Sequence, residues 1–374
     1  MNNIQKLEQL GQSIWYDNIS RGVIRRGELK KMVDQGLSGV TSNPTIFDKA
    51  ISGSNDYDDQ IREIVEADPR IDAAEIIKAL MVRDIQMACD VLKAAFDRTR
   101  GRDGYISIEV TPSKARETQA TMEEVRELWA RINRTNLMVK IPATKEGLPA
   151  IEQMTYEGRN INITLIFSVE RYREVAKAYI NGIERRVKEG KPVDHVASVA
   201  SVFVSRIDTL VDDLLTKRDP GKTKSLLGKA AVANSKMVYQ AYKEIFGAQR
   251  FAALRARGAK VQRPLWGSTG TKNPAYSDLL YVDSLIGPDT VNTVPPQTYA
   301  AILDHGRPGL SVEADLDSAR KILADLGVAG IDMQGVLVKL ENDGVAAFEK
   351  SFDGLYKNLV EKREQFAQAD VPHS

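Results

Sequence analysis

The segment LMVKIPATKEGLPAIEQMTYEGRNINITLIF, from Leu137 to Phe167, decides the fold. A short apolar run at Leu137–Ile141 is followed by a longer, charged run at Lys145–Thr155, and a second apolar run follows at Asn160–Phe167. Short β-branched runs of this kind are typical of buried strands. A helical stretch between two of them predicts a βαβ unit with parallel strands.

The same alternation extends to both sides of this segment. It gives eight strand-like runs, which imply a parallel α/β sheet and closure into a (β/α)8 TIM barrel. An open doubly wound sheet is the alternative, although no Gly-x-Gly-x-x-Gly follows the first strand. The expected strands are Ile14–Tyr16, Gly39–Thr41, Tyr105–Val110, Leu137–Ile141, Asn160–Phe167, Val196–Val202, Arg263–Trp266 and Val291–Val294.

Helical periodicity fills the segments between the expected strands. We expect residues 1–305 to form the barrel with additional helices, and 306–374 a C-terminal helical extension packed on it. Two connections, 44–104 and 206–262, are longer than a barrel needs and are also expected to be helical. The expected helices are Gly27–Gln35, Ala73–Thr99, Ser113–Asn133, Lys145–Thr155, Ser168–Lys188, Ser205–Thr216, Lys224–Phe246, Ala275–Ile286, Pro296–His305, Ser311–Asp325 and Val336–Phe366.

Composition bounds the partners of the chain. Its 374 residues include 52 Lys plus Arg against 51 Asp plus Glu, and this near balance argues against general affinity for nucleic acid. No signal-peptide pattern and no run of about 18 apolar residues occur, so neither export nor a membrane span is expected. The single cysteine, Cys89, can close no internal disulfide, and a cytoplasmic protein is the default.

Lys140 stands in the middle of an expected buried strand. A free lysine has a pKa near ~10.4 and is therefore a poor nucleophile at neutral pH. Burial disfavours the charged form and favours an amine that can attack a carbonyl group to form a Schiff base. Because side chains alternate along a strand, Val139 and Ile141 face the helices and Lys140 points into the barrel.

The same alternation points further polar side chains inward, near the carboxyl ends of the strands, where barrel active sites lie. Burying one unpartnered polar group costs roughly 1–3 kcal/mol, so stability alone hardly explains so many. Taken singly, they also fit a structural ion pair, bonded core polar groups or a strand-end turn. Asn43 is either an Asn-Pro turn or an amide at the barrel mouth. The inward set is Asp17, Glu109, Lys140, Asn162, Thr164 and Ser201.

A glycine-rich loop, Trp266-Gly-Ser-Thr-Gly-Thr-Lys-Asn-Pro274, follows the seventh expected strand. Loops after strands seven and eight of such barrels often form the phosphate-binding site, and this loop carries Ser268 and Lys272. Arg206, just past the sixth strand, could reach the same anion. Each feature alone also fits a solvated arginine or a plain turn, but together they favour a sugar-phosphate site.

No metal or cofactor is expected. The histidines His195, His305 and His373 are scattered and lack acid or cysteine partners at metal-ligand spacing. No Gly-x-Ser-x-Gly is present, which argues against a serine hydrolase.

Taken together, these residues resemble the transaldolase family, in its longer bacterial type within the class I Schiff-base aldolases. The motifs follow the family's order over roughly residues 13–300, and the set is specific although each motif alone is not. The family's better-known branch has an arginine in the loop after the seventh strand, where Lys272 is the nearest cation here. The motifs are Ile14-Trp-Tyr-Asp17, Gly39-Val-Thr-Ser-Asn-Pro-Thr45, Ser107-Ile-Glu-Val110, Val139-Lys-Ile-Pro-Ala-Thr144, Asn160-Ile-Asn-Ile-Thr-Leu-Ile-Phe-Ser168, Ser201-Val-Phe-Val-Ser-Arg206 and Trp266-Gly-Ser-Thr-Gly-Thr-Lys272.

The resemblance implies transfer of a dihydroxyacetone unit from sedoheptulose 7-phosphate or fructose 6-phosphate to glyceraldehyde 3-phosphate or erythrose 4-phosphate, in the pentose phosphate pathway. Lys140 would form the Schiff base, and Asp17 would take the C4 hydroxyl proton. Glu109 would shuttle protons through a water held by Thr164. The imine is the electron sink, so no cofactor is implied. The implied substrate contacts are Asn43, Asn162, Ser201 and Phe203, and the implied phosphate contacts are Arg206, Ser268 and Lys272.

Two other functions stay open. A related fructose-6-phosphate aldolase would release free dihydroxyacetone, but those enzymes are shorter and have glutamine and tyrosine in place of Glu109 and Phe203. A non-catalytic sugar-phosphate-binding barrel would leave Lys140 unreactive. The expected partners are sugar phosphates, without nucleic acid or membrane, and the chain is expected to be a monomer or homodimer.

Overall fold

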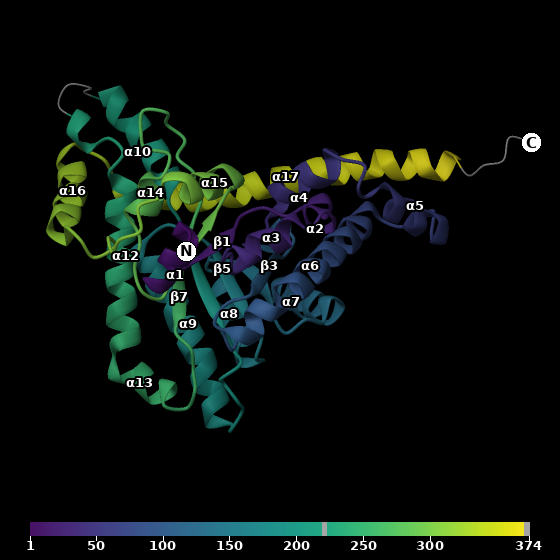
Figure 1. The fold of residues 1–374 in the computed structure, drawn as a ribbon, viewed down its shortest axis with the longest axis horizontal. Coiled ribbons are helices and arrows are strands. Elements are labelled where there is room, and N and C mark those ends of the chain that lie inside the picture. The colour runs from purple at the N-terminus through teal and green to yellow at the C-terminus, as the bar shows by residue number, and fades with distance from the viewer. Residues whose placement is uncertain (219–222, 370–374) are drawn as a thin grey trace, which may run out of the picture.

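The computed structural model describes residues 1–218 and 223–369 (Figure 1). Its strands are all parallel and close into one barrel in the order β1 to β8. The predicted (β/α)8 barrel is therefore confirmed, and the open sheet is wrong. The strands are β1 (Gln12–Tyr16), β2 (Gly39–Thr41), β3 (Tyr105–Glu109), β4 (Leu137–Pro142), β5 (Ile161–Ile166), β6 (Ser198–Phe203), β7 (Gln262–Gly267) and β8 (Thr290–Val294).

Helices cover the outside of the barrel, mostly where the sequence predicts them. The helix predicted at Ala275–Ile286 is wrong except for four residues. The side chains of Asn273 and Ser277 accept bonds from nearby backbone N–H groups there and hold turns instead. The helices are α1 (Asn3–Gln9), α2 (Arg21–Arg25), α3 (Glu28–Asp34), α4 (Pro44–Ser52), α5 (Asp58–Ala67), α6 (Ala73–Arg98), η1 (Pro112–Lys114), α7 (Thr118–Ile132), α8 (Gly147–Tyr156), α9 (Val169–Lys188), α10 (Ser205–Arg218), η2 (Lys224–Leu226), α12 (Ala230–Gly247), α13 (Gln249–Arg255), α14 (Leu280–Asp283), α15 (Pro296–His305), α16 (Leu316–Val328) and α17 (Met333–Ala369).

The two faces of the strands pack in separate apolar clusters. Outward-facing aliphatic residues such as Ile108, Val139 and Ile163 join the large core between the sheet and the helices. The inward face forms a second cluster, made of Trp15, Tyr105, Met138, Ala197, Val199, Leu265 and Val291. On β4 and β6 this inner cluster lies one inward position below the predicted polar residues, because Met138 precedes Lys140 and Val199 precedes Ser201 by two positions.

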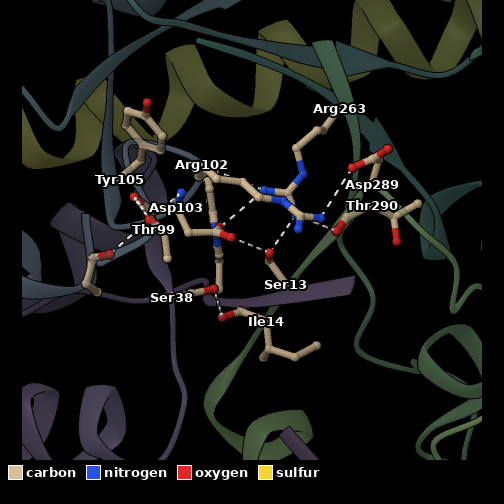
Figure 2. A network of polar contacts seen from close by, with 12 residues as sticks. Ser13, Ile14, Ser38, Thr99, Arg102, Asp103, Tyr105, Arg263, Asp289 and Thr290 are labelled. Carbon is tan, nitrogen blue, oxygen red and sulfur yellow. Dashed lines mark hydrogen bonds and ion pairs between the residues drawn. The ribbon is translucent and has the colours of Figure 1, made fainter. Parts of the chain in front are cut away.

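A buried polar network lies below the inner apolar cluster, at the amino-terminal end of the barrel (Figure 2). Arg263 on β7 forms an ion pair with Asp103, with Nη1 and Oδ1 3.2 Å apart, and also donates to Ser13 and to the carbonyl of Thr290. Trp15 donates its indole N–H to Asp103. Polar groups at this end of a barrel serve stability, so we assign this network to the scaffold.

The chain after β8 packs back onto the barrel. Helix α16 contacts α12, and the long helix α17 contacts α4, α5, α6, α10 and the strand β5. Figure 1 shows α17 as a yellow helix that runs past the barrel toward the C-terminus. A domain boundary at residue 305 stays a prediction. Among the described helices, none combines the length and apolarity needed to cross a membrane.

Candidate active site

Lys140 and Glu109 lie side by side on neighbouring strands. They are register partners of β4 and β3, and Lys140 Nζ is 3.0 Å from Glu109 Oε2. Nζ also donates to the carbonyl oxygen of Ser42, at 3.0 Å. Lys140 is 4% exposed and Glu109 5% exposed, so the amine is held in a nearly dry site beside one carboxyl group.

Burial changes the acidity of the carboxyl groups in this site. Desolvation raises the pKa of Glu109, and the positive charge of Lys140 opposes that rise. Desolvation also raises the pKa of Asp17, opposed first by a hydrogen bond from Thr41. Both groups are therefore easier to protonate than free carboxyls, which suits acid–base chemistry near neutral pH.

A chain of hydroxyl groups leads to Asp17, which directly follows β1. Thr41 Oγ1 donates to Asp17 Oδ1 at 2.6 Å, and Thr41 Oγ1 is also 2.6 Å from Thr293 Oγ1. A hydroxyl group has one proton to donate, so Thr293 is the donor to Thr41 when Thr41 donates to the carboxylate. Thr41 is on β2 and Thr293 on β8, the two strands that flank β1, and their hydroxyls fix the orientation of the Asp17 carboxyl.

A cavity of about 130 Å³ opens above Lys140. Its wall carries the side chains of Asp17 and Lys140, and Leu265 of the inner apolar cluster also lines it. Glu109 does not line this cavity but a neighbouring one of about 420 Å³, between α6, η1, α7 and α17. The predicted site residues that line the smaller cavity are Asp17, Asn43, Lys140, Thr164, Ser201, Phe203, Arg206, Ser268 and Lys272.

Asn162 is buried but does not line the cavity. Its Nδ2 donates to Ser107 Oγ at 3.0 Å, and its Oδ1 accepts from Ser201 Oγ at 2.6 Å. This pairing matches the alternative interpretation, in which these residues are core polar groups bonded to one another. A substrate contact from Asn162 stays a prediction, whereas Ser201 reaches the cavity wall itself.

Thr164 lies at an irregularity in β5. The register with β6 shifts between Ile163 and Ile166, and Leu165 has a φ of 60°. Such a bulge re-aims side chains next to functional sites. The Thr164 hydroxyl lines the cavity and is buried without a hydrogen-bond partner among the described residues. It is therefore free to hold a polar group inside the cavity.

Asn43 caps helix α4. Its Oδ1 accepts from the N–H of Ile46 at 2.9 Å, which is the usual N-cap arrangement. The residue also lines the cavity. Asn43 thus marks the connection from β2 to α4, and a contact from its amide to a substrate stays a prediction.

The predicted anion contacts Arg206, Ser268 and Lys272 line the cavity and also share the wall of a second cavity of about 520 Å³. Arg206 is in the first turn of α10, and burial lowers the pKa of its guanidinium without threatening its charge at neutral pH. Ser268 has a φ of 53°, and its Oγ is 2.9 Å from Ser205 Oγ at the start of α10. Lys272 is exposed. A partly buried arginine, a hydroxyl and a helix N-terminus together suit a phosphate group.

Seven residues of the cavity wall were not among the predicted site residues, and Thr41, Thr293 and Phe348 are three of them. Alternation could have found Thr293, because it shares a face with Val291 on β8, and Thr41 stands in a quoted motif. No local signal marks Phe348, which belongs to α17 and meets the site only through tertiary packing.

Comparison with known proteins places the chain in one family. The sequence model described as Transaldolase/Fructose-6-phosphate aldolase matches residues 14–359. A protein named Transaldolase from Saccharopolyspora erythraea is 46% identical, over 97% of this chain and 98% of its own length. Those from Trichodesmium erythraeum and Thiobacillus denitrificans are 45% and 44% identical, over 96% of this chain and 97% and 100% of their own.

Proposed function

Since the chain belongs to the transaldolase/fructose-6-phosphate aldolase family, we propose that its transaldolase activity runs through a Schiff base on Lys140. The enzyme transfers a dihydroxyacetone unit between sugar phosphates. Fructose 6-phosphate and sedoheptulose 7-phosphate are the donors, and erythrose 4-phosphate and glyceraldehyde 3-phosphate the acceptors. The observation that carries the covalent step is the buried Lys140 amine, 3.0 Å from Glu109 and on the wall of a cavity.

Schiff-base formation needs a proton shuttle. Lys140 Nζ attacks the C2 carbonyl of the ketose to give a carbinolamine, which loses water to form the protonated imine. Glu109 takes the proton from the attacking amine and returns one to the leaving hydroxyl, through a water held by Thr164. The raised pKa of Glu109 supports this assignment, and so does the Thr164 hydroxyl, which has no hydrogen-bond partner in the described part of the chain.

Carbon–carbon cleavage then needs a base on the substrate side. Asp17 removes the C4 hydroxyl proton, the C3–C4 bond breaks, and its electrons move into the imine to leave an enamine on Lys140. The aldose phosphate departs, and the second aldose phosphate forms the new bond by the reverse steps. Asn43 and Ser201 would hold the hydroxyls of the three-carbon unit, and Arg206, Ser268 and Lys272 the distant phosphate. The hydrogen bond from Thr41, which orients the Asp17 carboxyl, supports the role of Asp17 as the base.

Borohydride trapping tests the covalent step. With fructose 6-phosphate and borohydride, the protein is expected to gain the mass of a reduced three-carbon adduct, and peptide mapping is expected to find it on Lys140. An unmodified Lys140 under conditions of turnover would contradict the proposal and favour a binding barrel. Rapid release of free dihydroxyacetone without an acceptor would instead favour the aldolase.

Arg206→Ala is expected to raise the KM for phosphorylated substrates roughly tenfold to a hundredfold, because a hydrogen bond to a charged partner contributes about 1.5–3 kcal/mol. Lys272→Ala is expected to raise it no more than about fivefold, since exposed ion pairs contribute at most about 1 kcal/mol. Steady-state kinetics with fructose 6-phosphate and, as the control, unphosphorylated fructose measures both. An equal effect of Arg206→Ala on the KM of both sugars would show that Arg206 does not bind the phosphate.

Thr41→Val is expected to move the acid limb of the kcat/KM profile to higher pH. Asp17 must be ionised to accept a proton, and its pKa is already raised by burial. The Thr41 hydrogen bond lowers that pKa, so removing the bond raises it further and the ionised fraction falls at a higher pH. The wild-type limb is expected above the ordinary carboxyl range of about 3.9–4.3. If the acid limb of Thr41→Val stays at the wild-type pH, the limb does not report the ionisation of Asp17.

The remaining expectations follow from this chemistry. We propose that the protein works in the pentose phosphate pathway in the cytoplasm, as a monomer or homodimer that binds no nucleic acid. The imine itself serves as the electron sink in the proposed steps.

A further inference from the structure

The C-terminal helix α17 supplies one side chain to the catalytic cavity. Phe348 lines that cavity and is only 3% exposed. The centre of its ring lies 6.0 Å from Lys140 Nζ and 5.9 Å from Arg206 Cζ. Phe203, from β6, approaches the same guanidinium, with 5.2 Å between its ring centre and Arg206 Cζ. Phe348 is therefore next to both the reactive amine of Lys140 and the proposed phosphate contact Arg206.

The helix is held at this position by close packing. A Cβ atom at Gly344, one turn before Phe348, would lie 2.8 Å from Leu165 Cδ2, so any larger residue there would force the Leu165 side chain to shift. Leu165 is the residue with φ of 60° at the irregularity of β5. One turn after Phe348, Ser351 Oγ is 2.7 Å from Thr45 Oγ1. Helix α17 therefore contacts the barrel on both sides of Phe348, through Gly344 against Leu165 and through Ser351 with Thr45.

Water is the competitor of the acceptor sugar in the proposed reaction. After cleavage the enamine on Lys140 either attacks an aldehyde or takes a proton at carbon to give the imine. If water adds to the imine carbon and the bond from carbon to Lys140 Nζ breaks, dihydroxyacetone is released and the amine returns. An apolar ring over the amine excludes water from that carbon and offers water no hydrogen bond in exchange.

We propose that Phe348 is a specificity-determining residue, which shields the imine on Lys140 from water and so favours transfer over hydrolytic release. Phe348 also packs against Arg206 and helps to fix that guanidinium for the phosphate of the acceptor. This inference rests on the proposed Schiff base at Lys140. It gives α17 a function in the reaction in addition to its packing on the barrel.

The experiment compares Phe348→Ala with the wild type in two assays. The rate of free dihydroxyacetone release from fructose 6-phosphate is measured without an acceptor, and the transfer rate with erythrose 4-phosphate. The ratio of release to transfer is expected to rise about tenfold, because water reaches the imine carbon once the ring is removed. A tenfold change in this ratio corresponds to about 1.4 kcal/mol in activation free energy. Phe348→Leu keeps an apolar cover and is expected to give a ratio between the two. It also tests the idea if the alanine variant does not fold.

The matched control is Phe366→Ala, which removes an aromatic ring from the same helix where it packs on Arg62, with 5.0 Å between the ring centre and Cζ. Its ratio is expected to equal that of the wild type. A ratio unchanged in both Phe348 variants, or raised as much in the control, overturns the inference. Borohydride trapping separates this failure from that of the proposed function. An adduct on Lys140 in wild type and variants leaves the Schiff base standing, whereas no adduct in the wild type removes it.

Discussion

Replacement of Lys140 by alanine is expected to abolish turnover, with kcat lower by at least about 10³-fold, or about 4 kcal/mol in activation free energy. The reason is that Lys140 carries the one buried amine on the wall of the catalytic cavity among the described residues, and its Nζ is 3.0 Å from the carboxyl of Glu109. Lys272 also lines it but is exposed, and it lies among the anion contacts. Steady-state transfer with fructose 6-phosphate and erythrose 4-phosphate measures the loss, and borohydride is expected to leave the variant unmodified.

The fold is expected to survive this change, because Glu109 can respond to the loss of its partner. A buried carboxylate left without a counter-ion binds a proton, and burial already raises the pKa of Glu109. Circular dichroism and thermal unfolding test this. Lys236→Ala is the matched control, since that lysine is also nearly buried and donates to a backbone carbonyl outside the site. Near-normal turnover in Lys140→Ala would refute the covalent role.

Replacement of Asp17 by asparagine is expected to lower kcat by about 10²–10⁴-fold while Schiff-base formation continues. An amide cannot take the C4 hydroxyl proton, yet it keeps the size of the side chain and can still accept the bond from Thr41. Lys140 keeps its pair with Glu109, so the borohydride adduct with fructose 6-phosphate is expected to form at a rate near that of the wild type. Transfer and trapping are measured on the same preparation.

A comparison with Glu109→Gln makes the assignment of roles specific. That variant is expected to slow adduct formation itself, because the group next to Nζ no longer exchanges protons. Asp283→Asn serves as the control, since burial also raises the pKa of Asp283 but the residue lines neither cavity. If Asp17→Asn slowed trapping as much as Glu109→Gln does, the assignment of Glu109 to imine formation and of Asp17 to bond cleavage would be wrong.

Sequence reasoning reached most of the barrel because strand signals are local. Runs such as Leu137–Ile141 have one aliphatic face, and the burial of that face against helices forces the opposite face inward. The neighbouring strand then brings Glu109 beside Lys140 in register. The same reasoning failed for Ala275–Ile286, where polar side chains such as Asn273 hold backbone turns that helical periodicity does not reveal.

The sequence by itself indicated the alternation of strands and helices, the inward polar set and a glycine-rich loop after β7, since each follows from local residue patterns. Tertiary structure alone decided which polar groups reach the cavity. Asn162 is satisfied by Ser107 and Ser201, whereas the Thr164 hydroxyl has no partner among the described residues. Only the tertiary structure also places Phe348 next to the Lys140 amine, because the two residues are some 200 positions apart in the chain. Contacts between distant segments depend on how whole elements pack, and periodicity within α17 gives no sign of the partner that its buried face meets.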